Sequence, residues 1–209
     1  MEFMNNIWFT SDPHAYHKNI CRGTTSWDLT GSHQSTRDFH TPEEMTQEII
    51  DKWNSVVKPN DILYCLGDWA FAGHENIKRF REQLHCKTIH LIFGNHDQHI
   101  KPINSPYRQQ FASCQDVLEF SLKIDSQQSN KYGKQGFFLS HYSHQIWNQS
   151  HHGTIHLFGH SHGSLQGVGR SMDVGVDTHD LYPYHLDEIL WLMKDIPFIQ
   201  IDHHNKTTN

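Results

Sequence analysis

The sequence predicts an α/β fold with a parallel core. Three short apolar runs, residues 6–10, 61–66 and 88–93, alternate with two amphipathic segments, residues 42–56 and 75–84. This order of strand, helix, strand, helix, strand is typical of parallel sheets whose crossover connections are helical. Each run leads into a residue that can bind a metal or exchange a proton. We therefore expect chemistry at the carboxyl ends of these strands, where open α/β sheets bind ligands.

The first run stops before Asp12, Pro13 and His14. Pro13 cannot continue a strand ladder, and Asp12 and His14 are two residues apart, so an extended chain can direct both toward one ion. An Asx-type turn with an incidental histidine explains the same residues. This pair alone leaves both interpretations open.

Residues 17–41 are polar and without a clear period, which predicts a surface loop or a lid near the site. His17, in this segment, is a weak candidate for substrate contact. A helix is expected from Pro42, because Thr41 is a suitable N-cap and acidic residues follow in the first turn. Its apolar residues recur at helical spacing, and we assign this helix a packing role only.

The next two strands each end at a glycine and a potential ligand. Gly67 and Asp68 follow the strand at 61–66, and the strand at 88–93 leads into Gly94, Asn95, His96 and Asp97. A glycine at such a point permits a tight turn, and the turn presents the polar side chains at the end of the strand.

The second half changes character. Residues 117–124 alternate between apolar and polar, which predicts an antiparallel or half-exposed strand. Two further apolar runs lead into histidines: 137–139 into His141, and 154–158 into His160 and His162. A short strand at 172–176 and a helix at 186–193 follow. No linker is evident, so residues 1–209 are expected to form a single domain, with 203–209 as a flexible tail.

Composition narrows the function classes. The formal charge of -6 provides no basic face for long nucleic acids. Cys65 and Cys86 lie in or beside apolar runs and are expected to be reduced core thiols. We identify neither a signal-peptide pattern nor an apolar run long enough to span a membrane, and we expect a cytoplasmic protein.

The polar residues at the strand ends resemble a metal-ligand set. Carboxylate, amide and imidazole ligands without thiolate suit Mn, Fe, Zn, Ni or Mg rather than a structural zinc held by cysteine. Seven candidates are too many for one ion and fit two ions that share a bridging carboxylate. The candidates are Asp12, His14, Asp68, Asn95, His141, His160 and His162.

Taken together and in order, these motifs resemble those of the calcineurin-like metallophosphoesterase superfamily. The motifs are Asp12-Pro13-His14, Gly67-Asp68, Gly94-Asn95-His96-Asp97, Ser140-His141 and Gly159-His160-Ser161-His162. Segments 53–59 and 172–177 are similar to those of small bacterial and phage-type members, so the resemblance covers most of the chain. It implies a four-layer sandwich, in which two mixed β-sheets are flanked by helices.

The resemblance also implies a role for each residue. Asp12, His14 and His162 would hold the first metal; Asn95, His141 and His160 would hold the second; Asp68 would bridge them. His96 matches a histidine that is not a ligand and that stabilises the transition state or protonates the leaving oxygen. Asp97 or a backbone group would fix the tautomer of His96.

These roles predict a phosphoester hydrolase that depends on two divalent metal ions, with Mn²⁺ as the first choice. Two such ions lower the pKa of a shared water to about 7, so a metal-bridging hydroxide would be the nucleophile. A small phosphodiester or nucleotide-type substrate is expected, with a slight preference over monoesters because we recognise no basic pocket for a terminal phosphate. Arg170 is a second weak candidate for substrate binding.

Other functions remain open at this point. A nuclease, or a nucleotide or cyclic-nucleotide phosphodiesterase, would use aromatic residues near the site, for which the candidates are Trp27, Trp69, Phe71 and Trp147. A non-catalytic scaffold would be expected to lack ligands or the histidine at position 96, and this sequence retains all of them. A histidine-rich metal buffer is the weakest alternative, although the chain has 20 histidines.

Overall fold

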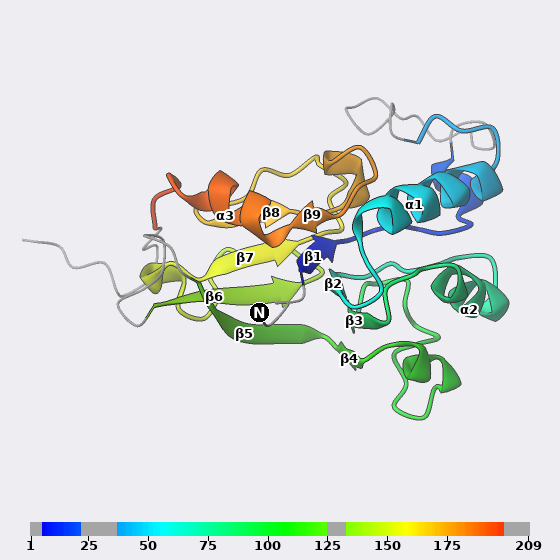
Figure 1. The fold of residues 1–209 in the computed structure, drawn as a ribbon, viewed down its shortest axis with the longest axis horizontal. Coiled ribbons are helices and arrows are strands. Elements are labelled where there is room, and N and C mark those ends of the chain that lie inside the picture. The colour runs from blue at the N-terminus through cyan, green and yellow to red at the C-terminus, as the bar shows by residue number, and fades with distance from the viewer. Residues whose placement is uncertain (1–5, 22–36, 125–132, 199–209) are drawn as a thin grey trace, which may run out of the picture.

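Two mixed β-sheets, packed face to face, form the centre of the computed structural model, which describes residues 6–21, 37–124 and 133–198 (Figure 1). The first sheet has the strand order β4-β3-β2-β1-β9. Its first four strands are parallel, and β9 pairs antiparallel with β1. The bounds are β1 Ile7–Thr10, β2 Ile62–Cys65, β3 Thr88–Ile92, β4 Ser113–Gln115 and β9 Tyr184–His185.

The second sheet has the order β5-β6-β7-β8. β5 pairs antiparallel with β6, whereas β6, β7 and β8 are parallel. Alternate residues of β5 are exposed, which confirms the prediction for this strand. The bounds are β5 Val117–Lys123, β6 Lys134–Ser140, β7 Ile155–Phe158 and β8 Ser171–Asp173. The predicted pair of mixed sheets is therefore confirmed.

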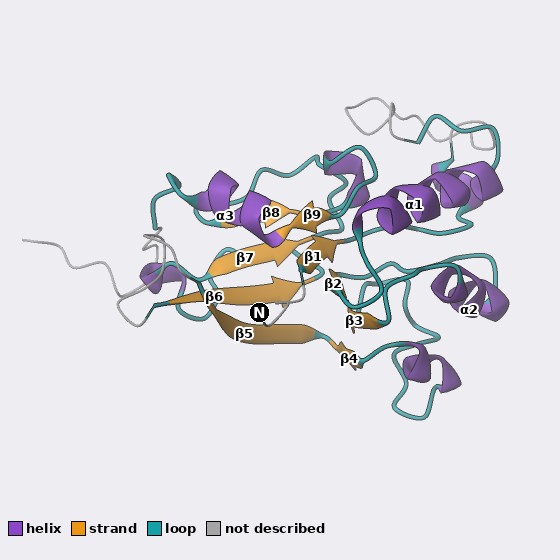
Figure 2. Cartoon of the chain, viewed as in Figure 1, coloured by secondary structure: helices purple, strands orange, loops and turns teal. Residues whose placement is uncertain are grey.

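Two apolar layers hold the sheets and helices together. Helices α1 (Pro42–Val56) and α2 (His74–Glu82) lie on the side of the first sheet that faces away from β5–β8, as Figure 2 also shows. Trp53 and Phe80 fill the layer between these helices and the sheet. Phe9, Leu139 and Leu157 fill the layer between the two sheets. Helix α3 (Leu186–Met193) packs beside β9 and β1 and contributes Ile189 to that second layer.

The outer face of the second sheet has a different cover. Side chains alternate across a strand, so Phe138 and His156 point away from the layer that contains Leu139 and Leu157. Both are buried, and Trp147, from the segment before the 3₁₀ helix η5 (Ser150–His152), packs against His156. This face is thus closed by an irregular segment in the described part of the chain.

Helix α1 begins where the sequence predicts, at a complete capping box. The Thr41 side chain accepts a hydrogen bond from the Glu44 N–H at 3.2 Å, and the Glu44 carboxylate accepts one from the Thr41 N–H at 3.3 Å. These two bonds satisfy backbone donors that the first helical turn cannot pair, and Pro42 has no N–H to satisfy.

The structure describes only the two ends of the segment that the sequence predicts as a loop or lid. Ile20, in the 3₁₀ helix η1 (Lys18–Ile20), is buried, as are Cys21 and Arg37. Residues 22–36, like the predicted tail at 203–209, lie outside the description. The lid, the tail and the single domain remain predictions.

Several other expectations can be compared with the structure. The predicted strand at 172–176 is shorter, Ser171–Asp173, and the 3₁₀ helix η6 (Val176–Thr178) follows. The sequence patterns did not indicate β4, β9 or the 3₁₀ helix η4 (Pro106–Gln110). Cys65 and Cys86 are buried, and all four cysteines, each of which is described, form no disulfide. None of the described helices is both long and apolar enough to cross a membrane.

Candidate metal centre

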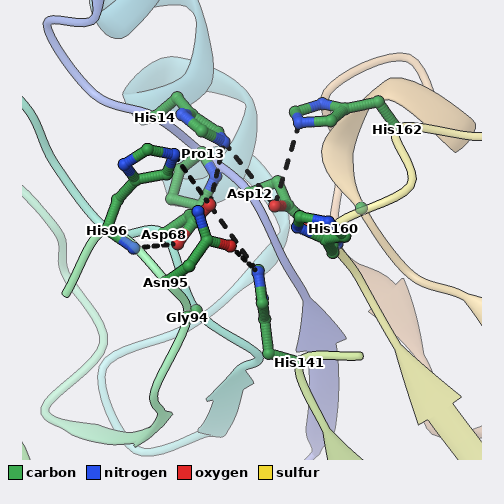
Figure 3. A network of polar contacts seen from close by, with 12 residues as sticks. Asp12, Pro13, His14, Asp68, Gly94, Asn95, His96, His141, His160 and His162 are labelled. Atoms are coloured by element: carbon green, nitrogen blue, oxygen red, sulfur yellow. Dashed lines mark hydrogen bonds and ion pairs between the residues drawn. The ribbon is translucent and has the colours of Figure 1, made fainter. Parts of the chain in front are cut away.

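The carboxyl ends of β1, β2, β3, β6 and β7 meet at one edge of the two sheets, and the predicted ligands follow these ends directly (Figure 3). Backbone bonds tie the ends together within each sheet: the Asp12 N–H donates to the Gly67 carbonyl at 3.0 Å, and the Gly159 N–H to the His141 carbonyl at 2.9 Å. The His160 N–H donates to Asp12 Oδ2 at 2.8 Å and joins the two sheets. The site is thus a product of the topology.

Two groups of three potential ligands result. Asp12, His14 and His162 form the first group, and within it one ligand atom from each residue lies within 4.8 Å of the others. Asp68, His141 and His160 form the second group by the same measure. The spacing is short enough for each group to surround one ion.

Asp68 lies between the groups. Its Oδ2 atom is 3.4 Å from His14 Nε2, in the first group, and 3.6 Å from His141 Nε2, in the second. Its Oδ1 atom accepts a hydrogen bond from the His96 N–H at 2.9 Å, which fixes the carboxylate plane. Asn95 joins the second group, because its Oδ1 is 3.0 Å from His141 Nε2. The structure thus brings all seven predicted ligands together.

The residues present fit a divalent cation. Asp12 Oδ1 and His14 Nε2 are buried and have no hydrogen-bond partner among the described residues, although both belong to the first group. A buried polar atom without a partner costs about 1–3 kcal/mol, so a cation would supply the interaction that these atoms lack. The oxygen and imidazole donors suit Mn²⁺, Fe, Zn²⁺ or Ni²⁺.

The backbone at the site adopts an uncommon conformation. Five of the ligand candidates have left-handed φ angles between 47° and 64°: Asp12, His14, Asp68, His160 and His162. Asp and His tolerate this region better than most residues, yet each such position carries strain. Left-handed residues turn the chain sharply after the strand, so the side chains face the neighbouring strand ends.

Two glycines allow the turns to approach one another. Gly67 has a φ angle of +108°, a value that disfavours any side chain. At Gly94 a Cβ atom would overlap the carboxylate and the N–H of Asp68. These glycines therefore define the separation between the β2 and β3 turns and, with it, the position of Asp68.

Three of the imidazoles have their second ring nitrogen engaged. His141 Nδ1 is 2.7 Å from the Leu66 carbonyl, His14 Nδ1 is 3.1 Å from His17 Nδ1, and His162 Nδ1 is 2.6 Å from Asp177 Oδ2. Such partners select one tautomer and hold the ring, which leaves Nε2 directed into the site.

His17 is therefore close to the site, where the sequence suggested it. Its ring stacks on Phe71 with the centroids 3.6 Å apart, and it is half-buried. Burial lowers the pKa of His17 to about 4, so the ring is neutral at pH 7. In this position its Nδ1 contacts His14 Nδ1 and helps to hold the His14 ring in place.

The carboxylates of Asp12 and Asp68 repel each other when no cation lies between them. Burial alone would raise the pKa of Asp12, but the surrounding histidines, His14 foremost, hold it below its usual range. Burial, together with the charge of Asp12, raises the pKa of Asp68 to about 7 against the effect of His141. Two carboxylates this close resist joint ionisation, and a divalent cation would remove that cost.

His96 lies beside the two groups, with Nε2 4.0 Å from Asp68 Oδ2 and 44% of its side chain exposed. Burial lowers its pKa, which Asp97 partly opposes. Its ring can thus reach both the centre and a bound molecule.

The Asp97 side chain faces backbone groups of two turns. Its carboxylate accepts hydrogen bonds from the backbone N–H groups of Asp68, Trp69 and Gly94 at 2.9, 3.0 and 2.8 Å. In the part of the chain that the structure describes, no hydrogen bond joins Asp97 to the His96 ring. The prediction that Asp97 fixes the tautomer of His96 therefore has no contact to support it; Asp97 instead holds the β2 and β3 turns together.

Three further candidates lie away from the metal groups or are buried. Arg170 lies at the amino end of β8, away from the site, and donates to the Lys194 and Ile196 carbonyls at 3.2 and 2.9 Å. Trp69 and Trp147 are buried, Trp69 in the apolar core and Trp147 against His156, so neither ring is open to a substrate base. Phe71 remains beside the site, and Trp27 lies outside the described residues.

Sequence reasoning missed Arg37 altogether. Its fully buried guanidinium contacts the carboxylate of Asp177 and the backbone carbonyl of Asp12. A single arginine in a polar segment carries no signal that would have identified it.

Comparisons with known proteins agree with this geometry. The family model described as calcineurin-like phosphoesterase matches residues 6–199. The chain is 25% identical to the Gene 66 protein of Mycobacterium phage D29, over 92% of this chain and 98% of that protein. It is 26% identical to the Gene 66 protein of Mycobacterium phage L5, over 84% and 88% of the two chains.

Two further matches cover either part of the chain or the fold alone. An uncharacterized protein of Methanocaldococcus jannaschii is 34% identical over 46% of this chain, and the match spans about half, 48%, of that protein. The crystal structure of a protein of unknown function from Aquifex aeolicus superimposes with a TM-score of 0.60 at 20% identity. It covers 90% of this chain and all (100%) of that chain, and this likeness concerns the fold alone.

Proposed function

Because the chain belongs to the calcineurin-like phosphoesterase family, we propose that it hydrolyses a small phosphodiester with two divalent cations, Mn²⁺ as the first choice. Asp12, His14 and His162 would hold one cation, and Asn95, His141 and His160 the other. The observation that carries the proposal is the position of Asp68, whose Oδ2 atom lies 3.4 and 3.6 Å from a histidine of each group. A carboxylate so placed can serve both cations.

Two bound cations supply a water of lowered pKa and positive charge that neutralises the phosphoryl oxygens. The protein's own residues do the rest. Asp68 and the histidines would hold the cations in place, and the exposed ring of His96 can donate a proton to the leaving oxygen. The pKa of His96 is lowered by burial, and the negative charge of a bound phosphoester would raise it again and favour the proton-donating form.

The preference for a diester is supported by the cavity next to His96. It has a volume of about 250 Å³, and its lining includes neither lysine nor arginine. The doubly charged terminal phosphate of a monoester would find no lysine or arginine in this lining, whereas the phosphate of a diester carries a single charge and has less need of one. The lining includes Phe71, Ala72, Gly73, His96, Gln98 and His99.

A nuclease or a nucleotide phosphodiesterase is the second candidate, now with fewer supporting residues. Of the aromatic residues proposed to stack on a base, only Phe71 lies at the site among those the structure describes, and its ring is already covered by His17. With a net charge of -6, a small nucleotide is a better candidate than a long nucleic acid. The cytoplasmic location predicted from the sequence stays a prediction.

The test compares hydrolysis of bis-p-nitrophenyl phosphate with that of p-nitrophenyl phosphate, both with added Mn²⁺. We expect a faster rate on the diester, loss of activity after exhaustive chelation, and a decrease of about 10²–10⁴-fold in kcat for His96→Ala. His85→Ala, an exposed histidine outside the site, is the control and should retain wild-type activity. Full activity in the chelated protein would refute the proposal.

A further inference from the structure

Arg37 is a buried arginine that the proposed chemistry does not use. Its side chain is inaccessible to solvent, with an exposed fraction of 0%. Its Nε and one terminal nitrogen donate to the two carboxylate oxygens of Asp177 at 2.8 and 3.0 Å. The terminal nitrogens also donate to the carbonyls of Asp12 at 2.7 Å and Pro13 at 3.1 Å. A buried charge is tolerated only when it is paired in this way, and the planar fork matches the carboxylate.

This guanidinium reaches the first metal group by two routes. Through Asp177 it acts on His162, because Asp177 Oδ2 is 2.6 Å from His162 Nδ1. That bond orients the ring so that His162 Nε2 is 4.0 Å from Asp12 Oδ1. Through the Asp12 carbonyl it also holds the left-handed turn from which the Asp12 carboxylate projects. Two of the three members of the first group therefore depend on Arg37.

The second group has no equivalent support among the described residues. The partner of His141 Nδ1 is the neutral carbonyl of Leu66, which belongs to the backbone. A carboxylate on the far nitrogen makes an imidazole a stronger electron donor than a carbonyl does, and outer contacts of this kind contribute to metal affinity. The two metal positions are thus built with different supports.

We propose that the Arg37–Asp177 pair is a positioning device that sets the cation affinity of the first position and leaves the second largely unaffected. This inference rests on the two-cation site of the proposed function. It makes Arg37 and Asp177 positioning residues, since neither would contact the cation or the substrate.

If Arg37 only stabilised the fold, its replacement would have a different effect on cation binding. Arg37 joins segments that are far apart in the sequence, so its loss could simply loosen the fold. A loosened fold lowers the stability of the metal-free protein and weakens both positions alike. Loss of positioning would instead weaken cation binding at the first position and leave the second position unchanged. This difference between the two positions separates the two explanations.

The experiment measures Mn²⁺ binding to the full chain by electron paramagnetic resonance of the free ion, with no ester present. Wild type should bind two equivalents. Asp177→Asn keeps the shape of the side chain but removes its charge, and it should weaken one equivalent by about 10–100-fold. The other equivalent should change by less than about threefold, within the ordinary variation of outer contacts. Arg37→Lys should act in the same direction, because an ammonium cannot form the fork.

Asp61→Asn is the matched control. Asp61 is buried like Asp177, with exposed fractions of 5% and 8%, and accepts hydrogen bonds from Trp8 Nε1 at 3.1 Å and from the Lys58 N–H at 2.8 Å. It lies next to the amino end of β2, at the opposite edge of the sheet from the metal groups. This variant should lose stability and retain both equivalents.

Each outcome decides the inference. An unchanged two-site isotherm for Asp177→Asn overturns it, and so does an equal loss at both positions. If Arg37→Lys fails to fold, Asp177→Asn decides alone, provided that its metal-free melting temperature is near that of Asp61→Asn. A wild type that binds two equivalents but cleaves no ester refutes the proposed function and leaves the inference standing. A wild type that binds fewer than two overturns both.

Discussion

Replacement of Asp97 by alanine tests whether this residue holds the two central turns of the site. The side chain is 2% exposed, and its carboxylate accepts three backbone hydrogen bonds at 2.8–3.0 Å. Two come from the turn after β2, at Asp68 and Trp69, and one from Gly94 after β3. In Asp97→Ala three buried N–H groups lose their acceptor together.

The magnitude follows from these three donors. An unsatisfied buried donor costs about 1–3 kcal/mol, and water entering the vacated space would satisfy part of the set. Burial raises the pKa of Asp97, an effect that the three donors oppose, so part of the favourable energy of the bonds offsets the cost of burying the charge. We expect a loss of about 3–5 kcal/mol in the free energy of unfolding, which is large against a typical total of 5–15 kcal/mol.

The assay is urea unfolding in excess chelator, so that bound cations do not contribute to the measured stability. Asp116→Ala is the control, because Asp116 is an exposed carboxylate that forms an ion pair with Lys101 at the surface, and its loss should cost less than about 1 kcal/mol. If Asp97→Ala costs no more than this control, the turns do not depend on the carboxylate and the reasoning is wrong.

Three further predictions concern stability and metal binding. Thr41→Ala removes the cap of α1 and should lower the free energy of unfolding by about 1 kcal/mol in the same assay; an unchanged urea midpoint would contradict it. Burial lowers the pKa of His156 to about 4, below the 6.5 of the unfolded chain, so its contribution to stability is present above pH 6.5 and lost as the pH falls toward 4. Between pH 7.5 and pH 5, wild type should therefore lose about 2 kcal/mol more than His156→Gln, and equal losses would refute the assignment. Gly94→Ala should displace Asp68 and weaken Mn²⁺ binding at least tenfold, whereas Gly133→Ala, where a Cβ atom has open space around it, should bind normally despite its strained φ; equal binding by both would contradict the packing argument.

Much of the fold could be predicted because its elements carry local signals. The capping residues and helical period of α1, the alternation in β5 and the glycine-terminated strands are all properties of short segments. β9 could not be predicted in this way, since two residues that pair with β1 have no period of their own. Its position follows from long-range packing of the segment that precedes α3.

The candidate ligands could be identified because topology gathers every residue that follows a parallel strand at one edge. The supporting contacts could not, because they join residues far apart in the sequence. Arg37 and Asp177 are 140 positions apart, and nothing near either one indicates the other. Asp97 shows the same limit: its neighbour in sequence is His96, but its side chain turns to backbone groups of another loop.

The left-handed turns at five of the ligand candidates have a consequence for the lifetime of the protein. Each such residue costs roughly 1–2 kcal/mol in local backbone energy, and the folded chain bears this cost whether or not cations are bound. A bound ligand whose concentration is 100 times its dissociation constant raises the free energy of unfolding by about 2.7 kcal/mol. The metal-free form is then the one most exposed to unfolding and proteolysis. We expect the amount of this protein in a cell to follow the supply of its cations, because metal starvation would shorten the survival of each molecule before it limited turnover.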